Sequence, residues 1–240
     1  MLELRNVCFD VVDQNGDKKQ ILKNINLRLD KNKIVVITGH NGSGKTTLVK
    51  IIMGILSPTS GQIFLDGENI TKLSIDERAR KGIAFAFQAP VRFKGMTVEK
   101  LLHTAFGKPA SLGEVCAVLS KVGLCARNYL KRELSANLSG GELKRIEIAS
   151  VLARDARLNI FDEPEAGIDL WSYDSLINVF KDLKRKSDSL NIIVSHQEKI
   201  MEIADEILIL NSAEVQSFGK SDVILKNIKK PICKKLKGGK

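Results

Sequence analysis

Near the start of the chain, apolar and polar positions alternate with the two-residue period of a β-strand. The alternation runs through residues 2–7 and again through residues 21–29. Between these segments, Asn15-Gly16 is a pair typical of tight hairpin turns. We therefore predict an antiparallel hairpin at the N-terminal end.

Mainly apolar runs bounded by polar or glycine-rich residues predict buried strands farther along. These runs are residues 34–37, 83–87, 157–161 and 191–194. Residues 63–65 predict a further strand that turns at Asp66-Gly67, and residues 206–210 with 215–218 predict a second hairpin.

Apolar residues spaced three or four apart predict helices in other segments. Between residues 89 and 138 these positions are Val98, Leu101, Leu102, Ala105, Val115, Val118, Leu119 and Val122. The insert interrupts the alternation of strands and helices, so we predict a small helical subdomain at about 89–138. Ser74-x-x-Glu77 is a capping box that predicts a helix through Arg80.

A glycine-rich turn between the run at 34–37 and a helix-like segment carries the first chemical signal. It reads Gly39-His40-Asn41-Gly42-Ser43-Gly44-Lys45-Thr46-Thr47. Glycines in this pattern let backbone N–H groups curl around phosphate oxygens, and the helix N-terminus adds partial positive charge. Lys45 is expected to reach the terminal phosphates and Thr46 to hold Mg²⁺. A plain glycine-rich hairpin is the alternative, but the flanking strand and helix favour a nucleotide site.

Polar residues at strand ends supply further candidates. Gln88 either ties down its strand end or reaches Mg²⁺ and the attacking water. Asp162 can hold Mg²⁺ through water, and Glu163 can polarise the attacking water. Each of these residues, taken alone, is also compatible with a solvated strand end, and a lone His196 is more often a cap or a surface residue.

Ser139, Gly140, Gly141 and Glu142 form a capping box before an amphipathic run. Two glycines in a first helical turn are costly unless the backbone approaches something closely. Bare N–H groups at the positive end of a helix suit a γ-phosphate, so we assign these residues to nucleotide binding.

Composition restricts the class of protein. The 240 residues suit one domain with a subdomain, no apolar run approaches the ~20 residues of a membrane span, and no signal-peptide pattern begins the chain. The net charge of +10 is concentrated at the end: residues 226–240 hold seven lysines and no acid, which leaves 10 − 7 = +3 for the rest. A solvated tail at 222–240 explains this better than nucleic-acid binding.

Cysteine usage fits a cytoplasmic protein. The four cysteines form no C-x-x-C pair and show no metal-ligand spacing, so we expect reduced, mostly buried thiols.

The ordered motifs resemble those of the ATP-binding cassette (ABC) ATPases, over essentially residues 1–220. The resemblance implies a P-loop α/β fold at 1–221, with a RecA-like core, an antiparallel β subdomain and the inserted helical subdomain. It implies ATP and Mg²⁺ as cofactors and an ATP-dependent homodimer that closes head to tail. Lys45 of one chain and the Ser139-Gly140-Gly141 turn of the other would then enclose each ATP. Glu163 becomes the base or water-polariser, His196 the γ-phosphate sensor and Asp169 the link across the dimer.

Residues 76–88, 139–148 and 195–200 resemble most closely the SufC branch, whose members are cassettes of the SUF iron–sulfur cluster assembly machinery. This resemblance implies a SufB/SufD-like scaffold as partner. Val11 stands where many transporter cassettes place an aromatic residue that stacks on adenine, so nucleotide binding is expected to be weaker by ~1 kcal/mol. The alternatives are the ATP-binding subunit of an ABC membrane transporter, and a nucleotide-gated module whose lysine tail grips RNA.

Overall fold

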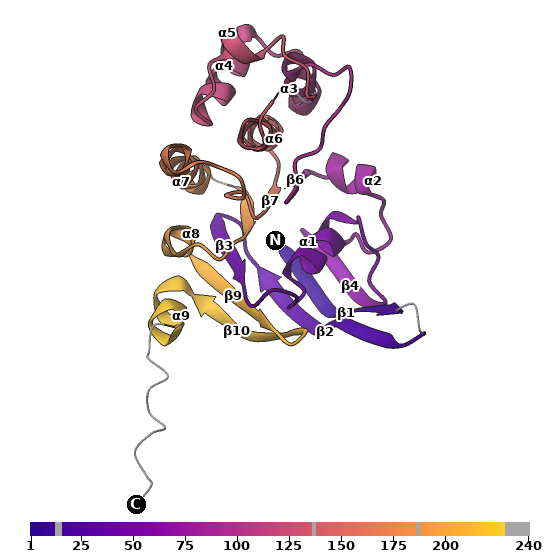
Figure 1. Cartoon of the computed structure of the whole chain (residues 1–240). Helices are drawn as coiled ribbons and strands as arrows, with labels where there is room; N and C mark the ends of the chain where they lie inside the picture. The colour runs from indigo at the N-terminus through magenta and orange to yellow at the C-terminus, as the bar shows by residue number, and fades with distance from the viewer. Residues whose placement is uncertain (13–15, 136–137, 186–187, 229–240) are drawn as a thin grey trace, which may run out of the picture.

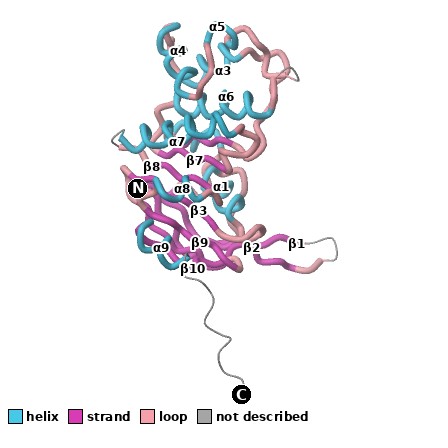
Figure 2. Tube along the Cα trace, turned by 60° about the vertical axis from the view of Figure 1, so that its left-hand side comes forward, coloured by secondary structure: helices cyan, strands magenta, loops and turns pink. Residues whose placement is uncertain are grey.

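The computed structural model describes residues 1–12, 16–135, 138–185 and 188–228. Within them, two sheets and a group of helices stack against one another, with the helical subdomain at one end (Figures 1 and 2). No helix of the described residues is long and apolar enough to cross a bilayer.

The first sheet is antiparallel, as the alternation predicts, with strand order β2-β1-β4-β5. Its strands are β1 Leu2–Val12, β2 Lys18–Leu29, β4 Ser60–Leu65 and β5 Glu68–Asn69. Asn24 has a φ of 50°, and the pairing of β1 with β2 shifts register nearby. Beyond this irregularity Leu22 is buried and Ile21 only partly so. The pairing confirms the predicted hairpin, while Asn15 of its predicted turn lies outside the described residues.

The second sheet forms the centre of the molecule, with strand order β10-β9-β3-β8-β7-β6. Its strands are β3 Lys33–Thr38, β6 Ile83–Ala86, β7 Leu158–Asp162, β8 Leu190–Val194, β9 Glu206–Asn211 and β10 Glu214–Lys220. All neighbours run parallel except β10, which forms the predicted hairpin with β9. Because the strands are parallel, their carboxyl ends meet along one edge of the sheet.

Side chains of β3 alternate between two hydrophobic cores. Ile34 and Val36 pack against the helices on one face, whereas Val35 and Ile37 pack against α1 and the antiparallel sheet on the other. The helices next to the central sheet are α1 Lys45–Met53, α2 Ile75–Arg80, α7 Leu170–Arg185, α8 Glu198–Ile203 and α9 Ser221–Ile228. Ser74 and Glu77 form the predicted capping box of α2.

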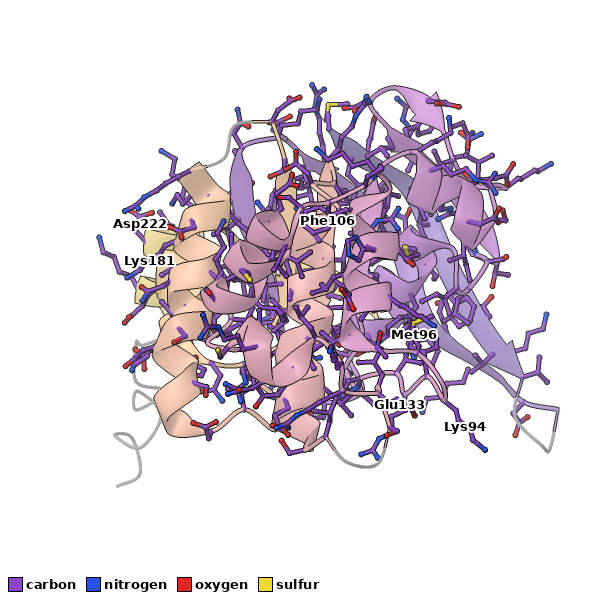
Figure 3. The ribbon with its side chains drawn as sticks, turned by 90° about the horizontal axis from the view of Figure 1, so that it is seen from above. Lys94, Met96, Phe106, Glu133, Lys181 and Asp222 are labelled. Atoms are coloured by element: carbon purple, nitrogen blue, oxygen red, sulfur yellow. The ribbon has the colours of Figure 1, made fainter. Side chains whose placement is uncertain are left out.

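The helical insert is observed, and a fourth helix packs with it. Its helices α3 Val98–Phe106, α4 Leu112–Lys121 and α5 Ala126–Tyr129 contact α6 Gly140–Ala153, which leads back to the core (Figure 1). The chain enters and leaves the insert side by side: Thr97 bridges Glu133, and the Leu134 N–H donates to the Met96 carbonyl at 2.8 Å. Figure 3 labels Met96 and Glu133 in this region.

Two expectations are corrected. The three described thiols are not mostly buried, since Cys8 and Cys116 are half-buried and Cys125 is exposed, while Cys233 lies outside the described residues. Ordered structure also continues past residue 221, because α9 occupies the first part of the predicted tail and buries Ile224. The rest of that tail, residues 229–240, lies outside the described residues.

Candidate active site

The phosphate-loop motif occupies the turn between β3 and α1, where left-handed backbone makes glycine necessary. Gly39 has a φ of 143°, and a Cβ there would lie 2.0 Å from the Leu210 carbonyl oxygen. Gly44 has a φ of 98° and precedes α1 without a side-chain cap. The loop therefore presents backbone N–H groups and the positive end of α1, as anion binding requires.

Lys45 lies inside this loop and is almost fully buried. Its Nζ donates to the carbonyl oxygens of Gly39 at 2.9 Å and His40 at 3.0 Å. Burial lowers the pKa of Lys45, while the nearby carboxylates of Glu163 and Asp162 act in the opposite direction. The ammonium group is thus held by the backbone carbonyls of the phosphate loop itself.

Asp162, the last residue of β7, faces Thr46 at the start of α1. The Thr46 hydroxyl donates to Asp162 Oδ1 at 3.2 Å. The other oxygen, Oδ2, is buried and has no hydrogen-bond partner among the described residues. Burial raises the pKa of Asp162. A buried carboxylate oxygen without a donor, beside a hydroxyl, is the kind of oxygen set that binds a hard divalent cation.

Glu163 and Gln88 meet at the carboxyl ends of neighbouring strands β7 and β6. Gln88 Nε2 donates to Glu163 Oε2 at 2.7 Å. Glu163 has a φ of 46°, which is uncommon for a non-glycine residue, and its N–H donates to the Val194 carbonyl of β8. Backbone of this kind is often retained at functional sites.

His196 follows β8 and joins the same region. It lines a groove together with Gly39, His40 and Asn41 of the phosphate loop. Burial lowers the pKa of His196, and Lys45 lowers it further. The imidazole is therefore favoured in its neutral form.

The Ser139–Glu142 turn opens α6 with the predicted capping box. Glu142 also accepts a hydrogen bond from the Tyr129 hydroxyl at 2.6 Å. A Cβ on Gly140 would meet nothing within 4 Å, whereas one on Gly141 would lie 2.7 Å from the Gly167 carbonyl oxygen. Within the described residues, no hydrogen bond joins this turn to the loop around Lys45; Ser139 and Gly140 are exposed, whereas Gly141 is half-buried beside Gly167.

Two other predicted residues lie apart from the phosphate loop. Asp169 accepts hydrogen bonds from the N–H and hydroxyl of Ser172 and so caps the start of α7. Val11 is 37% exposed on β1, opposite Lys19. Leu22 of β2 contacts Gly44 of the phosphate loop, and its partner on β1 is Phe9. Val11 lies two residues farther along β1 than Phe9.

Reasoning from the sequence missed four polar residues around this site. Lys144 is fully buried, and Glu147 lies beside it on α6. Glu165 accepts a hydrogen bond from the Ser195 hydroxyl, which directly precedes His196. A lysine and a glutamate three positions apart on a helix usually form a solvated pair, so only their inward orientation reveals them.

Comparisons with known proteins agree with this geometry. The family model described as ABC transporter matches residues 22–166. An uncharacterized ABC transporter ATP-binding protein of Methanocaldococcus jannaschii is 40% identical over 209 residues, covering 84% of this chain and 83% of the relative. The energy-coupling factor transporter ATP-binding protein EcfA2 of Clostridium acetobutylicum is 32% identical, with 95% of this chain and 82% of the relative covered.

A solved structure extends the likeness to the whole described fold. It is the dimeric post-hydrolysis state of an ATP-binding cassette bound to ADP and Pi, with a TM-score of 0.83 and 25% identity. The match covers 92% of this chain and 99% of that one. The fold is therefore the predicted nucleotide-binding cassette, and this chain belongs to the ABC transporter family as an ATP-binding ATPase.

Proposed function

We propose that this chain is the ATP-hydrolysing subunit of an ABC membrane transporter. The hydrogen bond between Gln88 and Glu163, beside the Thr46–Asp162 pair, carries the proposal for hydrolysis. The transporter assignment is supported by relatives that are named as transporter ATP-binding proteins. The relatives favour it over the scaffold partner that the SufC resemblance implies.

ATP would bind between two copies of the chain. Residues 39–47 would hold the phosphates of one ATP, with Lys45 turning from the loop carbonyls to the terminal phosphates. The Ser139-Gly140-Gly141 turn of the other copy would close over the same ATP, which is supported by the exposure of Ser139 and Gly140. Asp169 would link the two copies, and Val11 would stand at the adenine. The similar structure bound to ADP and Pi is itself dimeric.

Mg²⁺ fits the residues around the unpartnered oxygen of Asp162. Thr46, Gln88 and Asp162 would hold it, and the ion would neutralise phosphate charge. Asp162 would contribute Oδ2, for which the described residues supply no hydrogen-bond donor. Thr46 would contribute its hydroxyl, which already donates to Oδ1 of the same carboxylate. Oxygen ligands of this type match the preference of a small divalent cation.

Three side chains would act directly on the hydrolysis. Glu163 would orient and polarise the attacking water, because it directly follows β7 and its charge acts on Lys45 of the phosphate loop. Gln88 would hold that carboxylate in place through the hydrogen bond already present. A neutral His196 would donate a hydrogen bond to the γ-phosphate and sense its presence.

A cytoplasmic cluster-assembly ATPase that works on a SufB/SufD-like scaffold is the second candidate. It rests on the resemblance of residues 76–88, 139–148 and 195–200 to the SufC branch. Either partner would find an apolar contact just beyond Gln88, where Val91 is 42% and Phe93 43% exposed. The two candidates share the ATPase site and differ in the partner that closure of the dimer would move, which is a membrane transporter in one case and a soluble scaffold in the other.

The test is a pull-down with tagged Glu163→Gln in the presence of ATP and Mg²⁺. This variant should hydrolyse at least a hundredfold more slowly and accumulate as an ATP-bound dimer, because only the water-polarising carboxylate is lost. Lys45→Ala is the matched control, since it should bind ATP poorly and trap no dimer.

An integral membrane protein recovered with Glu163→Gln, but not with Lys45→Ala, is the expected result. Recovery of a soluble scaffold instead would replace the transporter with the second candidate. Turnover by Glu163→Gln at the wild-type rate would contradict the role given to Glu163.

A further inference from the structure

Helix α6 carries two ionisable side chains that face the interior. Lys144 is fully buried, and the side chain of Glu147 is only 13% exposed. Their closest charged atoms are 3.7 Å apart. Burying such a pair costs desolvation that its mutual attraction often fails to offset. Stability alone is therefore a weak explanation for a charged pair at this position.

Both side chains reach the backbone of Phe87, the residue before Gln88. Glu147 Oε1 accepts a hydrogen bond from the Phe87 N–H at 2.9 Å. Lys144 Nζ donates to the Phe87 carbonyl oxygen, and also to the Gln88 carbonyl at 3.3 Å. Residues three apart on a helix share a face, so α6 holds the N–H and the C=O of one residue at the same time.

This contact occurs where the sheet no longer holds the chain. The pairing of β6 with β7 ends at Ala86 and Phe161, so Phe87 lies just past the strand ladder. Lys144 also donates to the carbonyl oxygen of Asp162 at 3.3 Å. The Lys144 ammonium group therefore joins α6 to the chain just past β6, which leads to Gln88, and to the last residue of β7, which precedes Glu163.

We propose that Lys144 and Glu147 are positioning residues for ATP hydrolysis, which hold the Phe87 backbone so that Gln88 reaches Glu163. The proposal rests on the roles proposed above for Gln88 and Glu163. Glu147 acts through the Phe87 N–H, and Lys144 acts through the carbonyl oxygens of Phe87, Gln88 and Asp162. Because α6 begins at Ser139-Gly140-Gly141, the alignment of Gln88 with Glu163 depends on where this helix lies.

The experiment compares Glu147→Ala, Glu147→Gln and Lys144→Met by kcat, ATP affinity and ATP-dependent dimerisation. Glu147→Ala and Lys144→Met should lower kcat at least tenfold while ATP affinity stays within twofold, because the loop around Lys45 is untouched. Glu147→Gln keeps an acceptor for the Phe87 N–H and should retain most of the activity. Ser150→Ala is the matched control, since its hydroxyl bonds only the carbonyl of Glu147 within α6.

A double-mutant cycle with Gln88→Ala separates this inference from a general packing defect. If Glu147 acts through Gln88, adding Glu147→Ala to Gln88→Ala should lower kcat no further. Glu147→Met in the same background gives the same test if Glu147→Ala does not fold, whereas Lys144→Met does not, because Lys144 also holds the Asp162 carbonyl beside Glu163. The inference would be overturned if the losses of kcat from Glu147→Ala and Gln88→Ala added in the double mutant. It would also be overturned if Glu147→Ala lowered kcat no more than Ser150→Ala does. Wild-type kcat in Gln88→Ala alone would instead overturn the proposed role of Gln88.

Discussion

Glu147 is a carboxyl group whose ionisation opposes folding. Burial raises its pKa from 4.5 to about 7, although Lys144 and the Phe87 N–H favour the charged form. Because the folded state binds the proton more tightly, the stabilisation from this group is complete below pH 4.5 and lost as pH rises through about 7. The loss amounts to at most about 3 kcal/mol of unfolding free energy.

Glu147→Gln should remove this pH dependence, because an amide does not ionise. Denaturant titrations at pH 5.5, 6.5 and 7.5 measure the unfolding free energy. As pH rises across this range, we expect the value for the wild type to fall relative to that of the variant. Parallel pH profiles would show that Glu147 ionises as freely in the folded chain as in the unfolded one.

The residues of the site were predictable where a short motif carries the chemistry. Lys45, Asp162 and Glu163 follow apolar runs, and parallel strands bring the ends of such runs to one edge. Lys144 and Glu147 lack such a marker. Their inward orientation depends on how α6 packs against the loop after β6, and no local pattern in the sequence specifies that packing.

At the scale of elements, the two glycines of the α6 turn differ in their surroundings. Gly141→Ala would place a methyl group 2.7 Å from the Gly167 carbonyl oxygen, so the backbone before α7 would have to shift. We expect a loss of about 1–3 kcal/mol in unfolding free energy, measured by denaturant titration without nucleotide. Gly140→Ala meets open space and should leave stability unchanged or raise it by up to about 1 kcal/mol.

Gly140→Ala, which should not reduce stability, should nevertheless impair ATP-dependent dimerisation. In the Glu163→Gln background, Gly140→Ala should weaken the ATP-dependent dimer at least tenfold, because its methyl group would occupy the surface that faces the partner's γ-phosphate. Light scattering with and without ATP measures this. A normal dimer with Gly140→Ala would remove Gly140 from the nucleotide site, and an unaltered stability of Gly141→Ala would contradict the close contact.

Most strands could be predicted, and some helices were missed for identifiable reasons. The buried residues of α7 include Leu176, Ile177, Val179, Phe180 and Leu183. This spacing is present in the sequence, but many charged residues on the other face of the helix make the apolar stripe narrow. The register of β2 could not be predicted, because the left-handed backbone at Asn24 shifts which residues point inward.

On the scale of the whole molecule, most of the excess charge belongs to residues 229–240, which lie outside the described residues. Residues 229–240 contain six lysines and no acid, so removing them lowers the net charge to 10 − 6 = +4. The last described element, α9, is joined to the rest of the described chain by hydrogen bonds and burial. Ser221 Oγ donates to the Met201 carbonyl at 2.9 Å, the Ser221 N–H donates to the Asp205 carbonyl, and Ile224 is buried.

Two truncations therefore have different consequences. Deletion of residues 229–240 should leave the melting temperature and the ATPase rate within error of the wild type. Deletion of residues 221–240 should lower the melting temperature by several degrees, because burial of Ile224 alone is worth about 2 kcal/mol. Differential scanning calorimetry and a phosphate-release assay measure the two quantities.

The shorter truncation also tests the nucleic-acid alternative. If the lysines grip RNA, the full chain should bind single-stranded RNA with an affinity that falls steeply as salt is raised, and the chain without residues 229–240 should lose that binding. We expect instead only weak binding by the full chain, because the chain without residues 229–240 carries a net charge of only +4. An ATPase rate that rises with RNA in the full chain, but not in the truncated one, would assign the tail a function in the ATPase cycle.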